Sequence, residues 1–354
     1  MARSTDRPPD TALSEREQDV LRRVVQHFIG TASPVGSKAL AEAVELSSAS
    51  VRTTMQQLEA AGYLGHPHTS AGRVPTERGY RTYVDDLMDV TGLSEREAGL
   101  LRESVRRRLG DLDAVARDTS RLLGRLSQLL GVVLTPRLST GVLERIEVVP
   151  LGSTRVLFVL ALRGGLARTV TAEADVEVDV GAVDAVVQRL NERLAGHTLE
   201  EIRRTGADRV QDLADDDRTG IVRVVLREGP ALFREAAPER RAAIGGAQHL
   251  VAQPEFNRPE LVRDVVELAE SEDVVVHLLE RPRLVDPSEP DRAVVMIGRE
   301  VAREGPSYSV VTAPYRLGDA VGAVAVIGPT RMDYARAVVL VEHVAGLLGD
   351  PAAD

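Results

Sequence analysis

Residues 48–57 carry small and polar side chains at a spacing that suits contact with the edges of nucleic-acid bases. A glutamine amide can pair in a bidentate way with adenine, and an arginine guanidinium can pair with guanine or with a phosphate. Small side chains between such groups permit close approach to the groove. The alternative interpretation is a polar helix face that contacts only water. The side chains concerned are Ser48, Ser50, Arg52, Thr53, Gln56 and Gln57.

Three short helices are expected to position this segment. Ser14 and Glu17 have the spacing of a capping box, and an amphipathic helix runs from them to Ile29. Ser37 and Ser48 are expected to cap the second and the third helix. The side chains of the third helix that must pack on the other two are Val51, Met55 and Leu58.

A small β-hairpin is expected after the third helix. Residues 63–64 and 73–75 flank a turn-forming run at 69–72. Three helices followed by such a hairpin form a winged helix, whose wing contacts the DNA backbone or the minor groove. His66 and His68 flank a proline and have no third ligand nearby, so their spacing does not indicate a metal site. The wing residues predicted to contact DNA are His68, Thr69, Ser70, Gly72 and Arg73.

The charge pattern restricts any nucleic-acid contact to a local surface. The chain of 354 residues has a formal net charge of -10, so it is not a polycation as a whole. Between Leu46 and Tyr83, however, the sequence has four arginines and only two glutamates, which is a local excess of positive charge. The single lysine of the chain, Lys38, is a further candidate DNA contact. Aromatic residues make up 3% of the chain and tryptophan is absent, which argues against binding single strands by base stacking.

Other function classes lack the residues that they need. The absence of cysteine excludes disulfides, thiolate metal sites and cysteine nucleophiles. No P-loop contains the lysine, the histidines have no metal-ligand spacing, and no serine lies in a nucleophile elbow. We therefore expect no enzyme, no cofactor and no metal. Residues 1–13 indicate a disordered tail, and no apolar run reaches the ~18 residues of a membrane span, so a cytoplasmic protein is expected.

The chain as a whole predicts a multidomain α+β fold. The winged helix is expected at 14–90, with helices following to about residue 130. Strand-like runs at 143–151, 155–162 and 166–172 predict an antiparallel meander. A mostly helical block and further strands follow, which suggests one sheet domain with an insertion. The predicted boundaries are 91–175 and 275–350 for the sheet domain and 176–274 for the insertion.

Several sequence blocks occur in an order that is typical of one known family. The longest is PHTSAGRVPT at 67–76, followed by GYR at 79–81. The others lie at 13–16, 34–38, 190–194, 253–256 and 327–334. With these blocks, almost the whole chain resembles the family of the heat-inducible transcription repressor HrcA.

The resemblance implies a homodimeric repressor of chaperone operons that binds a CIRCE-type inverted repeat in double-stranded DNA and loses activity on heat stress. It also implies a GAF-like sheet domain, an inserted dimerisation domain and support from a GroE-type chaperonin. The chain departs from the family at Thr53, where an asparagine usually follows the arginine, so base contacts there cannot be carried over. The competing hypothesis is a ligand-sensing GAF-type regulator or an interaction module whose winged helix does not read DNA specifically.

Overall fold

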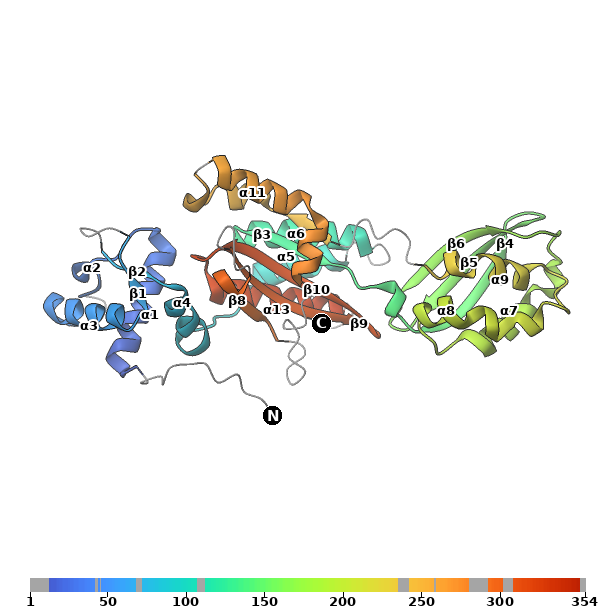
Figure 1. Cartoon of the computed structure of the whole chain (residues 1–354), viewed down its shortest axis with the longest axis horizontal. Helices are drawn as coiled ribbons and strands as arrows, with labels where there is room; N and C mark the ends of the chain where they lie inside the picture. The colour runs from blue at the N-terminus through green and yellow to red at the C-terminus, as the bar shows by residue number, and fades with distance from the viewer. Residues whose placement is uncertain are drawn as a thin grey trace.

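The computed structural model of the chain has three units that lie in a row (Figure 1). We call them the N-terminal unit (residues 13–90), the central unit (95–134 and 242–350) and the distal unit (138–234). The central unit lies between the other two, and the distal unit is inserted into its sequence. The structure describes residues 13–41, 44, 46–67, 72–106, 112–234, 242–257, 259–279, 292–301 and 308–350.

The N-terminal unit consists of helices and a short hairpin in the predicted order. The capping box at Ser14 is present, since Ser14 accepts from the Glu17 backbone and Glu17 accepts from Ser14. Ser47, and not Ser48 as predicted, caps the third helix, because the Ser50 amide donates to Ser47 Oγ at 3.1 Å. The elements are α1 (Glu15–Thr31), α2 (Ser37–Ala41), α3 (Ser48–Ala60), β1 (Leu64–Gly65), β2 (Val74–Pro75), α4 (Glu77–Thr82) and the π-helical turn η1 (Tyr83–Leu87).

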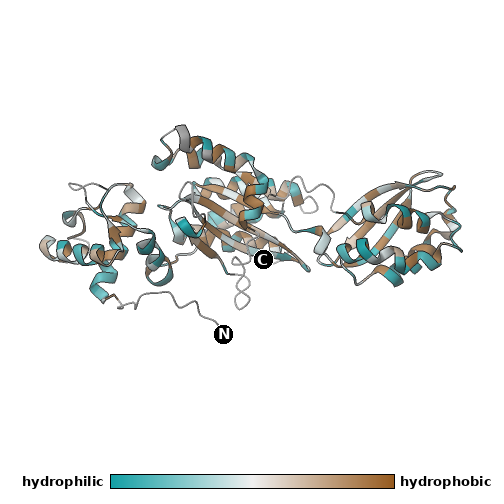
Figure 2. Ribbon diagram, in the orientation of Figure 1, coloured by the Kyte–Doolittle hydropathy of each residue, from teal (hydrophilic) through white to brown (hydrophobic). Residues whose placement is uncertain are grey.

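A five-stranded antiparallel sheet forms the centre of the central unit, with strand order β7-β3-β10-β9-β8. Alternation along β3 turns Val132 toward one apolar cluster and Val133 toward the other, so both faces of the sheet are buried. Helices α5, α6 and α13 pack on the Val133 side, and α10, α11 and α12 pack on the Val132 side. Hydrophobic residues therefore concentrate along these strands (Figure 2).

The elements of the central unit are α5 (Glu95–Arg106), α6 (Leu112–Ser127), β3 (Leu130–Leu134), β7 (Ala242–Gly245), α10 (Ala247–Val251), the turn η6 (Pro254–Phe256), α11 (Pro259–Glu270), α12 (Glu272–Leu279), β8 (Val294–Ile297), the turn η8 (Gly298–Glu300), β9 (Tyr308–Leu317), β10 (Ala320–Pro329) and α13 (Tyr334–Gly349). None of the helices in the described ranges is long and apolar enough to cross a membrane.

The distal unit is a three-stranded sheet with helices on one face. The meander β4-β5-β6 was predicted and is confirmed, and alternate residues of β5 from Val156 to Leu162 are buried under the helices. The elements are the turn η2 (Leu138–Thr140), β4 (Leu143–Pro150), β5 (Arg155–Leu162), β6 (Ala167–Glu173), the turn η3 (Val180–Ala182), α7 (Val183–Leu194), α8 (Leu199–Val210), the turn η4 (Gln211–Leu213) and α9 (Ile221–Leu232).

The predicted boundaries of the insertion need correction. The chain leaves the central sheet after Leu134 and returns to it at Ala242, so the meander belongs to the insertion and not to the central sheet. Residues 242–274, predicted as part of the insertion, belong to the central unit instead. The expected strand at 242–251 is the short β7 followed by α10. Local alternation identifies strands, but it does not say which sheet they join.

Gly131→Ala tests the close packing of α6 on β3. A Cβ atom at residue 131 would lie 2.3 Å from the Ser120 carbonyl oxygen and 2.6 Å from the Gly124 nitrogen, both backbone atoms. The helix and the strand must then separate, so we expect the free energy of unfolding in urea to fall by about 1–3 kcal/mol.

Gly99→Ala in α5 is the matched control. Nothing lies within 4 Å of a Cβ atom at that position, and alanine has the higher helix propensity. We expect the control to unfold at the same urea concentration as the wild type or at a higher one. Equal behaviour of the two variants would contradict the packing argument.

Candidate nucleic-acid interface

Helix α3 separates its residues into a buried face and an exposed face. Val51, Met55 and Leu58 are at most 3% exposed, as predicted. On the other side, no hydrogen bond or ion pair with another described residue engages the side chains of Arg52, Gln56 and Gln57. The exposed side chains of α3 that were predicted to contact DNA are Arg52, Thr53, Gln56 and Gln57. This face therefore offers amide and guanidinium donors that are available to an external partner.

Hydrogen bonds organise the first turn of α3. Ser37 Oγ of α2 lies 3.1 Å from Ser48 Oγ, and Ser47 Oγ donates to Ser50 Oγ at 3.0 Å. Arg16 of α1 donates to the Ser50 carbonyl at 3.0 Å. The predicted contacts Ser48 and Ser50 are therefore half-buried and partly engaged within the unit.

Lys38 lies on the neighbouring helix α2. Its side chain is exposed and has no partner among the described residues. Because α2 packs directly on α3, this ammonium extends the polar surface by one positive charge.

The two threonines that follow Arg52 occupy different environments. Thr53 is exposed, and its hydroxyl donates to the Ala49 carbonyl at 3.2 Å. Thr54 is 2% exposed and donates to the Ser50 carbonyl at 3.2 Å. Of these two threonines, only Thr53 can therefore contact an external partner, so the departure from the family pattern at Thr53 lies on the exposed face of α3.

The base of the hairpin is held against the connection between α1 and α2. Val35 and Arg73 exchange backbone hydrogen bonds of 2.8 and 2.9 Å. A Cβ atom at Gly72 would lie 2.4 Å from the Val35 carbonyl oxygen, so only glycine permits this approach. The structure therefore gives Gly72 a packing role. The predicted contacts His68, Thr69 and Ser70 lie outside the described residues.

Arg73 was predicted to contact DNA from the wing, and in the structure its guanidinium has partners within the N-terminal unit. Its guanidinium lies 2.7 Å from Glu59 Oε2 of α3, and the side chain is only 16% exposed. It also donates to His66 Nδ1 at 3.0 Å, while His66 Nε2 lies 3.0 Å from Glu59 Oε1. A phosphate would have to displace Glu59 before it could bind this arginine.

His66 is therefore part of a hydrogen-bonded cluster at the base of the hairpin. Within the ranges that the structure describes, no group of three or more metal-ligating side chains comes together. Glu59 is the participant that the sequence did not reveal, because its partner follows fourteen residues later, across a turn. Only the opposite charges of the two residues could have suggested the pair.

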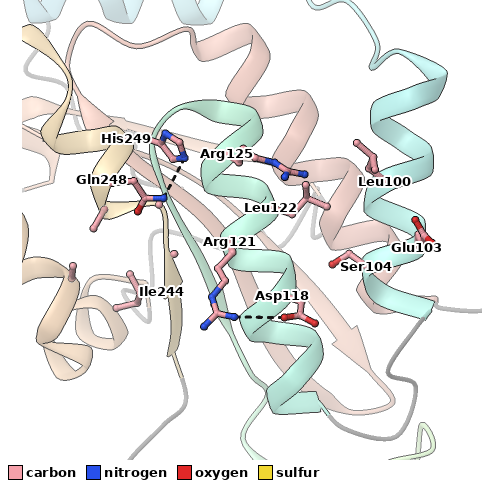
Figure 3. A pocket seen from close by; sticks show the side chains of 14 residues that line it. Leu100, Glu103, Ser104, Asp118, Arg121, Leu122, Arg125, Ile244, Gln248 and His249 are labelled. Atoms are coloured by element: carbon pink, nitrogen blue, oxygen red, sulfur yellow. Dashed lines mark hydrogen bonds and ion pairs between the residues drawn. The ribbon is translucent and has the colours of Figure 1, made fainter.

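A groove of about 780 Å³ opens in the central unit between α5, α6 and the turn from β7 to α10 (Figure 3). Arg121 and Arg125 of α6 line it, and so do Glu103 and Asp118. Arg121 lies 3.8 Å from Asp118, so part of its charge is compensated. Two cations and two carboxylates give the groove no net preference for an anionic or a cationic ligand.

Comparison with known proteins identifies the family. Residues 113–338 match the family model described as "HrcA protein C terminal domain". The heat-inducible transcription repressor HrcA of Chlorobium phaeobacteroides (strain BS1) is 40% identical over 344 residues, which cover 95% of this chain and 97% of that protein. The chain belongs to the HrcA family. The HrcA repressor of Prosthecochloris aestuarii is 38% identical, and the match covers 97% of this chain and 98% of that protein.

A solved structure is also similar along its length. It is described as a hypothetical protein, has a TM-score of 0.60 at 21% identity, and the match covers 96% of this chain and 98% of that one. At this identity the likeness establishes a shared fold. The named HrcA relatives are transcription repressors and not enzymes, which agrees with the absence of catalytic motifs in the sequence.

Gly72→Ala tests the close approach at the base of the hairpin. The added methyl group would clash with the Val35 backbone and break the paired hydrogen bonds with Arg73. We expect faster hydrogen exchange at the amides of Val35 and Arg73, by about tenfold or more. Gly65→Ala is the control, since its Cβ atom would only touch the Thr76 methyl group at 3.7 Å. Unchanged exchange in Gly72→Ala would refute the packing role.

Proposed function

We propose that this HrcA-family chain is a heat-inducible transcription repressor that binds a CIRCE-type inverted repeat in double-stranded DNA as a homodimer. The observation that carries the proposal is the exposed face of α3, where Arg52, Gln56 and Gln57 point outward without partners in the described chain. The names of the relatives, which match over nearly their full length, support the same function. The central groove is the feature that favours the second candidate, a ligand-sensing GAF-type regulator.

In this proposal the N-terminal unit is a winged helix and α3 is its recognition helix. Gln56 and Gln57 contact base edges, while Arg52 contacts a guanine or a phosphate. Lys38, Ser48 and Ser50 lie at the start of α3 or beside it and contact the DNA backbone. His68, Thr69 and Ser70, which the sequence assigns to the wing, are proposed as further DNA contacts. Arg73 contributes a phosphate contact only after it exchanges Glu59 for DNA.

The uncovered face of the distal sheet supports the proposed dimer. Leu157, Val159 and Ala161 lie on the face of β5 opposite the helices and are half-exposed. Val149 of β4 faces Leu157 across the strand pair and is 45% exposed. These apolar residues alternate with charged residues of β4 and threonines of β6, and apolar groups on a sheet face without a covering layer are typical of a protein interface.

The occupant that this face fits best is a second copy of the chain. On the same face, Glu147 lies opposite Val159 and Arg145 opposite Ala161, and the two charges form a 2.7 Å ion pair. A two-fold axis that passes between them would place each charge opposite its complement in the other copy. We therefore propose that the distal unit is the inserted dimerisation domain and that the central unit is GAF-like. The family resemblance further supports a GroE-type chaperonin as the partner that maintains active repressor. On heat stress the amount of active repressor is proposed to fall.

The first test is a fluorescence anisotropy titration over a salt series with an inverted repeat, a single half-site and a scrambled duplex. We expect tight binding to the inverted repeat alone, at one dimer per duplex. Equal and weak binding to all three duplexes, with GroE present as well as absent, would refute specific repression and favour the ligand-sensing candidate.

Gln56→Ala should reduce discrimination more than total affinity. Loss of one bidentate base contact costs about 1–3 kcal/mol on the operator and nothing on scrambled DNA. Lys38→Ala should instead weaken binding to all duplexes and lower the salt slope by about one ion. Gln188→Ala in the distal unit is the control and should behave as wild type. If Gln56→Ala and Lys38→Ala changed the three duplexes in the same way, the assigned roles would be wrong.

Val159→Glu should weaken the dimer. It places two carboxylates in the proposed interface, one from each copy, so we expect the dimer dissociation constant to rise by about tenfold or more in analytical ultracentrifugation. Val274→Glu is the matched control, because Val274 is 51% exposed on α12 of the central unit. A dimer that tolerates Val159→Glu but dissociates with Val274→Glu would place the interface on the central unit.

A further inference from the structure

The sequence blocks at 253–256 and 327–334 meet the end of α1 where the N-terminal unit contacts the central unit. Arg331, in the block at 327–334, donates from Nε to Glu255 Oε1 at 2.6 Å and from Nη2 to Glu255 Oε2 at 3.2 Å. It also donates to Gln253 Oε1 at 2.9 Å, which belongs to the block at 253–256. The same guanidinium donates from Nη1 to the Ile29 carbonyl at 2.6 Å.

The Ile29 carbonyl lies in the last turn of α1, where helix carbonyls lack partners within the helix. The last turn of α1 contains no basic residue, although a cation there would interact favourably with the helix dipole. Arg331 supplies that cation from 302 residues away along the chain. With 11% of its side chain exposed, this arginine binds α1 to the central unit in a setting largely shielded from solvent.

A second group of contacts lies at α4, which faces the central unit (Figure 1). Arg81 donates to the Val295 carbonyl at 2.7 Å and pairs with Glu300 at 2.5 Å. The pKa of Arg81 is raised, against the effect of burial, mainly by the Glu300 carboxylate. The Tyr80 ring packs on Tyr334 with 5.8 Å between centroids. Two separate contact points prevent rotation of the N-terminal unit about either one.

The connection that follows the N-terminal unit is also held. Arg336 of α13 pairs with Glu97 in the first turn of α5, and with the Ser94 hydroxyl it holds the pKa of that carboxyl at about 2. The start of α5, where the chain enters the central unit from the N-terminal unit, is therefore fixed to α13.

We propose that Arg331 is a positioning residue for DNA binding, which fixes the direction in which the central unit presents α3. Glu255 of the central unit contacts Arg331, which binds the C-terminal end of α1. At the other end of α1, Arg16 donates to the Ser50 carbonyl of α3, so the position of α3 follows that of α1. This inference rests on the proposed function as a dimeric DNA reader. It adds that the body of the protein, and not the DNA, sets the separation of the two recognition helices.

The length of α1 explains why one contact has this effect. Its 17 residues span about 25 Å at 1.5 Å per residue. Without the Arg331 contact, a tilt of α1 by roughly 10° would shift one of its ends relative to the other by about 4 Å, which exceeds the step of roughly 3.4 Å between neighbouring base pairs. Loss of the contact would therefore relax which half-site spacing the dimer selects.

The test is a series of inverted repeats whose half-sites are moved apart or together by one to three base pairs. We expect the wild type to prefer one spacing by about tenfold, and Arg331→Ala to reduce that preference to about threefold or less while binding a single half-site as the wild type does. Arg331→Lys should restore only part of the preference, because an ammonium cannot reproduce the bidentate contact.

Arg227→Ala is the matched control. Arg227 also pairs with a carboxylate, Asp175, and donates to a backbone carbonyl, that of Glu173, but it lies in the distal unit. It should keep the wild-type spacing preference. An unchanged spacing profile in Arg331→Ala would overturn the proposal, and so would tighter binding at the original spacing, which would make the contact a restraint against DNA binding. Failure of the wild type to bind any repeat would instead refute the proposed function.

A second measurement does not depend on DNA. Because the chain has no cysteine, Ala60→Cys and Glu267→Cys place two spin labels on exposed sites of the N-terminal and central units. With excess unlabelled protein to suppress distances between protomers, pulsed electron resonance should give a narrow distance distribution that Arg331→Ala broadens and Arg227→Ala does not. An equally narrow distribution in Arg331→Ala would refute the positioning role, whatever the DNA results.

Discussion

The arrangement of this molecule depends on one buried charge that two units share. The Arg331 guanidinium is almost fully enclosed and cannot lose its proton, so acceptors must surround it. They come from Glu255 and Gln253 of the central unit and from Ile29 of the N-terminal unit. Removing the arginine would leave the Glu255 carboxylate and the Ile29 carbonyl without this partner, and removing the acceptors would leave a buried cation uncompensated. Because acceptors from both units bind the same guanidinium, this one cation holds together two units that are far apart in sequence.

Features that depend on neighbours in sequence were predictable. The capping box at Ser14 follows from a serine and a glutamate three positions apart, and the meander follows from alternation over short runs. The same holds for the exposed face of α3, because one apolar stripe at helical period decides which side faces outward. The outward placement of Arg52 and Gln56 is a consequence of that stripe alone.

Features that depend on distant partners were not predictable. The strands of the central and distal sheets alternate alike, and only β7 pairing with β3 across the insertion shows which belong together. Arg73 has no local sign that Glu59 neutralises it. Asp217 belongs to a run with four aspartates at 212–217, yet it is 6% exposed and accepts from the Val222 amide at the start of α9. In each case a tertiary contact decides the role of the residue.

These contacts together explain how an acidic chain can act as a DNA reader under the proposed function. Arg73 is already paired with Glu59, so near α3 mainly Lys38 and Arg52 remain to bind phosphates. A single N-terminal unit therefore has little electrostatic affinity for DNA. Two units on one duplex gain affinity by acting together, but only if their separation matches the half-sites. Under the proposed function, a fixed separation of the two recognition helices thus provides the affinity that a more basic protein would obtain from its positive charge.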